Sequence, residues 1–179
     1  MDNSTEGVTL LTGFVFDILS EYQGMKRVCG PAFDMAKGLD PSKPEEWCSI
    51  DLYNGVCTWI EENAGAMSIR QAGIAIGKRI YGNIVTSGKL VDPTPLAIMQ
   101  ALKWAASVMI RDPRGRGWEI LASDDHSVTM RRTQTFNCPM QEGLLVALVE
   151  RTGVEGADVE HYKCTKRNDD YCEYRLSWL

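Results

Sequence analysis

The sequence predicts an α+β domain in which helices pack on an antiparallel sheet. Up to about residue 110 the apolar residues recur at helical spacing, whereas from Trp118 onward short apolar runs alternate with polar turns. The last third reads as two hairpins with one helix between them, in the order β-β-α-β-β. Helices gathered before and between antiparallel hairpins form a layer against the sheet.

The length and composition of the chain agree with one folded domain. It has 179 residues, of which 44% are hydrophobic and 24% charged, enough for a sizeable core. The formal net charge of -5 opposes a large basic nucleic-acid footprint. No apolar run approaches the ~20 residues that cross a bilayer, and residues 1–6 lack the basic region of a signal peptide. We therefore expect reduced cysteines, a cytoplasmic location, and no nucleic-acid or membrane partner.

The first predicted helix runs from residue 8 to about residue 22. The apolar residues on one of its faces are Leu11, Phe14, Val15, Ile18 and Tyr22. This face packs either on the chain's own core or on a second copy across a two-fold axis. A loop with two prolines follows at 38–44. We expect residues 1–45 to form an N-terminal helical extension that could dimerise, and residues 46–179 to form the main domain.

Three longer helices are predicted next. Ser49 can cap a helix that ends near residue 63, and Thr94 followed by Pro95 is a typical helix start for a segment ending near residue 110.

Between these two helices, a helix from Met67 to about residue 85 is predicted, with Ser68 as its cap. Its apolar stripe consists of Ile69, Gly73, Ile76, Ile80 and Ile84. Gly73 and Gly77 each cost about 1 kcal/mol relative to alanine in a helix. We therefore expect a close neighbour there, either another helix or a ligand.

The second half begins with a turn at 112–117, since no strand leads into its two arginines and no helix opens from them. The expected elements are, in order, strands 118–122 and 128–132, a helix 141–151 with Gly153 as its C-cap, and strands 158–163 and 171–178.

Cys138, His161, Cys164 and Cys172 form a candidate metal site in this half. Thiolates and imidazole are ligands that Zn²⁺ selects, and four of them close a tetrahedral shell. A polar hairpin turn at 165–170 would bring Cys172 back beside Cys164. The alternative is three buried thiols and an unrelated histidine, because free cysteine is among the most buried residue types. Chemistry alone leaves both interpretations open.

The segment from about residue 67 to residue 179 resembles the 4-vinyl-reductase domain family. That family includes the sensor domains of bacterial phenol-responsive transcription activators, and the chain is also similar to a myxobacterial paralogous family. In the phenol sensors, a cysteine, an acid and two more cysteines hold zinc at the spacing of Cys138, His161, Cys164 and Cys172. His161 replaces a glutamate, and histidine is an equally good zinc ligand. The resemblance implies bound zinc and the fold shared by haem nitric-oxide sensors and Golgi transport-particle subunits.

Helices laid on a sheet commonly leave an apolar cavity between the layers. We expect this cavity to be lined by Ile76, Ile80, Trp104, Met109 and Trp118. Packing in a closed core is the alternative role for these side chains. The resemblance implies that the cavity takes a small hydrophobic or aromatic effector.

Catalytic groups are sparse, so we expect no enzyme. The chain has two histidines, of which His161 belongs to the candidate metal site and His126 to a polar turn. No phosphate loop, dinucleotide fingerprint or nucleophile elbow is present in the sequence. Four protein ligands would also leave zinc no position for an activated water.

The sequence thus predicts a zinc-containing ligand-binding sensor domain, acting as a homodimer or through a signalling partner protein. One alternative is an assembly scaffold without a small ligand, which a closed core would favour. A cavity of about 300 Å³ or more would favour the sensor. The other alternative is a tetrapyrrole-related enzyme or accessory protein, the activity that named the family.

Overall fold

The computed structural model describes residues 4–88, 90 and 92–179. The helices of this part are α1 (Gly13–Glu21), α2 (Gly30–Met35), α3 (Ile50–Ala64), α4 (Ala66–Thr86), α5 (Pro95–Met109) and α6 (Cys138–Glu150). The strands are β1 (Thr9–Leu11), β2 (Trp47–Ser49), β3 (Ile110–Arg111), β4 (Trp118–Ser123), β5 (Ser127–Arg132), β6 (Asp158–Lys163) and β7 (Cys172–Ser177).

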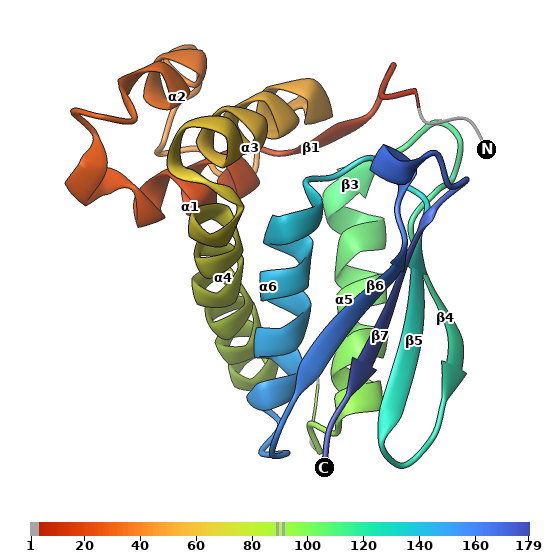
Figure 1. The fold of residues 1–179 in the computed structure, drawn as a ribbon. Helices are drawn as coiled ribbons and strands as arrows, with labels where there is room; N and C mark the ends of the chain where they lie inside the picture. Colours follow the sequence, from red (N-terminus) through yellow and green to blue (C-terminus); the bar gives the residue numbers. More distant parts are fainter. Residues whose placement is uncertain (1–3, 89, 91) are drawn as a thin grey trace.

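The larger sheet is antiparallel, with the strand order β4-β5-β7-β6. Figure 1 shows the helices gathered on one face of this sheet, with α6 between the sheet and α4. The predicted order β-β-α-β-β is present as β4-β5-α6-β6-β7. The expected α+β class is therefore confirmed.

The first predicted helix is wrong over its first turn. Residues 9–11 form β1, the central strand of a second sheet with the order β2-β1-β3. Val8 and Leu10 are buried in the core, so burial alternates as in a strand. Leu11 also fits the helical stripe of α1, which hid the strand period of two.

The apolar face of α1 lies in the chain's own core, where Val15 and Ile18 are fully buried. Of the two packing alternatives for this face, the described structure contains the intramolecular one. β1 pairs with two strands of the segment 46–179. The described residues of the two predicted segments therefore share one hydrophobic core.

Two of the predicted helix starts are confirmed by their caps. The side chains of Ser49 and Thr94 each accept a hydrogen bond from a backbone N–H in the following turn. Ser68 is not a cap, because α4 begins directly after Gly65. The Ser68 hydroxyl instead hydrogen-bonds the hydroxyl of Tyr22, at 3.1 Å.

Helix α6 begins three residues before the predicted start at Gln141. The Asn137 side chain accepts a hydrogen bond from the Met140 N–H at 3.0 Å, and Pro139 occupies the first turn. Both residues favour a helix start. As a result Cys138 lies in the first turn of α6.

The predicted turn at 112–117 is present, and Arg116 forms a buried ion pair with Asp112 inside it. Gly153 is not the C-cap of α6, because the cap is Arg151. Gly153 follows in the turn with a φ of 92°, a conformation that favours glycine.

Three glycines allow α4 and α6 to touch backbone to backbone. A Cβ on Gly73 would collide with the carbonyl oxygen of Met140, and one on Gly143 would collide with that of Arg70. Gly77 faces the backbone of Leu144 in the same way. The close neighbour expected at Gly73 and Gly77 is therefore a helix.

None of the helices in the described ranges is both long and apolar enough to cross a membrane.

Candidate metal centre

The four predicted metal ligands lie together at the edge between α6 and the sheet. Cys138 comes from the first turn of α6, His161 from β6, Cys164 from the residue after β6, and Cys172 from the start of β7. One ligand atom of each residue lies within 4.8 Å of all the others. The Cys138 sulfur is 3.6 Å from that of Cys164 and 3.9 Å from that of Cys172. Tetrahedral zinc holds its sulfurs about 3.8 Å apart, so this spacing suits the ion.

The connection from β6 to β7 fixes the position of two ligands. Arg167 donates a hydrogen bond to the His161 carbonyl oxygen at 2.8 Å, and the Asp169 carboxylate accepts one from the Cys164 N–H at 2.7 Å. The predicted turn contains a short 3₁₀ helix, and Asn168 caps this helix in the left-handed backbone conformation, with a φ of 67°. The chain therefore returns to place Cys172 beside the other thiols.

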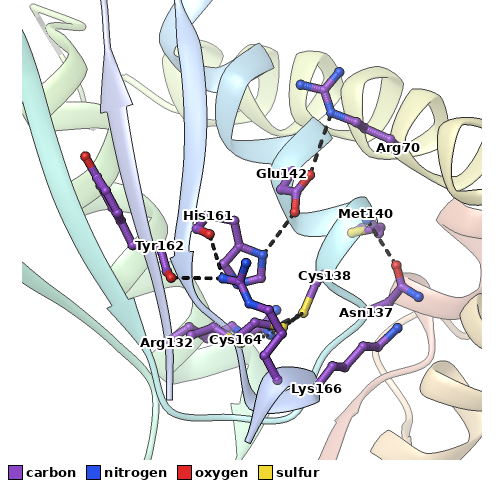
Figure 2. A network of polar contacts seen from close by, with 12 residues as sticks. Arg70, Arg132, Asn137, Cys138, Met140, Glu142, His161, Tyr162, Cys164 and Lys166 are labelled. Atoms are coloured by element: carbon purple, nitrogen blue, oxygen red, sulfur yellow. Dashed lines mark hydrogen bonds and ion pairs between the residues drawn. The ribbon is translucent and has the colours of Figure 1, made fainter. Parts of the chain in front are cut away.

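His161 is oriented by groups on both sides of its ring. Its Nδ1 lies 3.1 Å from a carboxylate oxygen of Glu142, and the ring stacks on Tyr174 with centroids 4.2 Å apart. Figure 2 shows Glu142 between His161 and Arg70 of α4. The Nε2 atom is buried without a hydrogen-bond partner. A carboxylate holding one nitrogen while the other is vacant is the usual arrangement of a metal-binding histidine.

The electrostatics of the thiols favour a cation. A hydrogen bond from the Cys138 thiol, together with the nearby His161 ring and the positive charge of Arg132, lowers the pKa of Cys172 to about 2 against the effect of burial. The same hydrogen bond and burial raise the pKa of Cys138. Burial lowers the pKa of His161, but the Cys172 sulfur and the Glu142 carboxylate outweigh it, so that pKa is raised. The side chains of Cys138, Cys172 and His161 thus shift one another's pKa, and a metal ion would displace their protons on binding.

Arg132, at the end of β5, is a member of the cluster that the sequence analysis missed. Its side chain is fully buried and donates hydrogen bonds to the sulfurs of Cys172 and Cys138, at 3.2 and 3.6 Å. Every second residue of β5 faces the core, including Val128 and Met130. That alternation would have placed Arg132 inward, opposite Cys172 in the sheet.

An apolar cavity of about 360 Å³ adjoins this centre, between α1, α4, α5, the start of α6 and the start of β4. Four of the predicted lining residues face it, namely Ile76, Ile80, Met109 and Trp118. Trp104 does not line this cavity; it is 54% exposed and borders a second groove between the end of α4 and α5, which shares Ile80 and Met109 with the cavity. On α5 the cavity is lined by Leu102, Ala105, Ala106 and Met109, and a residue two positions from Leu102 lies on the opposite helix face.

Residues from the N-terminal segment also line the cavity, which the sequence analysis did not anticipate. Phe14 and Asp17 of α1, with Glu45 of the following loop, contribute to it. Burial raises the pKa of Asp17, although Arg79 nearby opposes the rise. Asp17 and Glu45 are the charged residues of the described lining, and both are acidic.

Comparison with known proteins shows the fold and leaves the family open. No protein-family model matches the chain, and no curated protein matches its sequence. Its fold is similar to an H-NOX protein from S. oneidensis in the Fe(II)NO ligation state, with 10% identity, a TM-score of 0.67, and coverage of 94% of this chain and 99% of that chain. A mutant Fe(II) unliganded H-NOX protein from K. algicida gives 11% identity and a TM-score of 0.62, covering 94% and 97%. The fold implied by the resemblance is therefore confirmed.

The residues of the cavity do not fit the haem that this fold holds in the H-NOX proteins. No histidine or cysteine occurs in its described lining, and His126 lies in the turn between β4 and β5. Burial raises the pKa of Tyr53 well above its ordinary value, and its hydroxyl donates to the Met140 sulfur, so it is a poor ligand for iron. The described lining also contains no arginine, lysine or histidine that could pair with the haem propionates.

Proposed function

We propose that this chain is a zinc-containing sensor domain that binds a small hydrophobic molecule in the cavity beside the metal centre. The observation that carries the proposal is the segment 136–140. Phe136 and Met140 line the cavity, and Cys138 between them belongs to the cluster. One short segment thus contacts both the ligand space and the metal. Its position gives a ligand a direct way to alter the metal centre and the start of α6.

Zinc is the ion that best suits the ligand set. Three thiols and one imidazole match a closed tetrahedral shell. Such a shell stabilises structure and leaves no coordination position for a reacting water. We therefore propose that the domain is not an enzyme. Zinc would tie the start of α6 to the hairpin β6-β7, whose first strand is only half-buried.

The cavity also helps to choose between the sensor, the assembly scaffold and the tetrapyrrole-related protein. Its volume of about 360 Å³ lies within the range of small-molecule sites, which favours a sensor over a scaffold with a closed core. Its acidic lining disfavours an anionic tetrapyrrole. We propose, as the resemblance to the 4-vinyl-reductase family implies, that the domain acts in the cytoplasm as a homodimer or through a partner protein.

Filling the cavity is expected to block ligand binding. Ala106 lines the cavity and Val108, on the same helix, is 52% exposed and does not. The uncharged dye N-phenyl-1-naphthylamine is a suitable probe. Ala106→Phe should weaken dye binding about tenfold or more, because the new phenyl ring would occupy the space that the dye needs. Val108→Phe should leave the dissociation constant of the dye within about twofold of the wild-type value. Fluorescence titration measures both. Equal binding by the two variants, or none by the wild type, would count against the cavity as a ligand site.

A further inference from the structure

Arg132 carries a positive charge that the described protein pairs with no carboxylate. Its side chain is 1% exposed. Its Nη2 donates to the Phe136 carbonyl oxygen at 3.2 Å and to two cysteine sulfurs. Its Nε and Nη1 are buried without hydrogen-bond partners. Burying an unpaired guanidinium is strongly unfavourable, so its neighbours must supply negative charge.

Aromatic rings supply part of that compensation. The guanidinium carbon lies 6.0, 5.8 and 5.7 Å from the ring centroids of Trp118, Phe136 and Tyr174. Cation–π contacts stabilise a desolvated cation. They do not neutralise a full charge, and the sulfurs are the remaining candidates.

The charges balance if the centre holds a divalent ion. Three thiolates and a neutral imidazole around Zn²⁺ leave one net negative charge. Arg132 contributes one positive charge, because a guanidinium stays protonated in proteins. On the opposite side, the negative Glu142 is paired with Arg70 at 4.0 Å. The whole group is then neutral, as a buried cluster requires.

We propose that Arg132 is the counter-cation of the metal centre, a positioning residue that neutralises the excess charge of a three-thiolate, one-imidazole zinc site. It also holds the Cys138 and Cys172 sulfurs through its two hydrogen bonds to them. This inference depends on the metal centre proposed above. It further makes Arg132 the contact between that centre and the cavity, because Trp118 and Phe136 line the cavity.

A double-mutant cycle tests the charge balance. Arg132→Met leaves the zinc site one negative charge in excess and should weaken zinc binding at least about tenfold. Cys164→His leaves one positive charge in excess beside Arg132, but the double variant is neutral again. Cys164 is the exchanged ligand because its sulfur has no hydrogen bond with Arg132. The loss of zinc affinity caused by Cys164→His should therefore be about tenfold or more smaller in the Arg132→Met background than in the wild type.

Competition with a chromogenic chelator gives the four dissociation constants. Arg131 is the matched control, since it is the next residue of β5 and pairs with Glu119 at the surface. Arg131→Met should show no coupling to Cys164→His. Arg132→Lys keeps the charge and should behave as the wild type in the cycle, and Arg132→Gln is a second neutral variant should the methionine variant fail to fold.

The outcomes separate the two proposals. If the variants bind zinc and the double variant loses the affinity expected from the two single variants to within about twofold, the role of Arg132 is overturned. The metal centre itself would still stand. A wild-type protein that takes up no zinc would overturn both.

Discussion

Replacing Cys172 with serine is expected to empty the metal centre and to lower the stability of the fold. Cys172 is fully buried at the start of β7, and its sulfur is within reach of Cys138, Arg132 and Thr165. A structural zinc ion couples binding to folding. At zinc concentrations near a thousand times the dissociation constant, its loss costs on the order of 4 kcal/mol. For a chain of this size the melting temperature should fall by roughly 8 to 16 °C.

Cys48→Ser is the matched control for this variant. Cys48 is also a buried free cysteine, but it lies in β2, outside the cluster. Its variant should keep one zinc per chain and lose far less stability. Calorimetry with and without a chelator compares the two, since the chelator should lower the melting temperature of Cys48→Ser and leave that of Cys172→Ser unchanged. Equal melting temperatures for wild type and Cys172→Ser, with metal in neither, would contradict the site.

Replacing Gly73 with alanine is expected to cost about 3 kcal/mol, although alanine is the better helix former. The new methyl group would meet the carbonyl oxygen of Met140, a backbone atom that cannot rotate away. α4 and α6 would have to separate. That movement would draw the first turn of α6, with Cys138, away from β7. The melting temperature should fall by roughly 6 to 12 °C.

Gly82 provides the control in the same helix. A Cβ at Gly82 has no neighbouring atom within 4 Å, so Gly82→Ala should raise stability by up to about 1 kcal/mol. Urea denaturation of both variants gives the two changes. A Gly73→Ala variant as stable as Gly82→Ala would contradict the close contact between the helices.

The regular elements could be predicted from the sequence because local chemistry specifies them. Ser49 and Thr94 fix helix starts through their own side chains, and the hairpins β4-β5 and β6-β7 follow from alternation and polar turns. β1 could not, because a three-residue strand depends on partners far along the chain, at Cys48 and Ile110. Tertiary pairing overrode a helical pattern that was otherwise sound.

The candidate site divides in the same way. The types and spacing of four residues predicted the cluster, because thiols and an imidazole are recognisable wherever they occur. The roles of Arg132 and Glu142 were not predicted, because each role depends on which residue lies beside the side chain in the folded protein. Trp104 was misplaced by a helix that is apolar on more than one side, where the pattern does not say which side faces the cavity.

The H-NOX proteins of the same fold hold haem, yet the described lining of the cavity in this chain contains no histidine and no basic residue. The metal-binding groups lie instead at the edge of the sheet, where β6, β7 and the start of α6 meet. On this account, metal binding and ligand binding occur at two different places in the domain. The proposed metal would stabilise the fold, and the cavity would be free for a neutral hydrophobic molecule.

Zinc content is the most direct test of the account. Elemental analysis of freshly purified wild-type protein, with native mass spectrometry of the same sample, gives the number of metal ions per chain and any additional bound mass. The account predicts one zinc ion per chain, retained through gel filtration and lost with Cys172→Ser. Protein that is folded and free of metal, and that takes up no zinc when it is supplied, would contradict it.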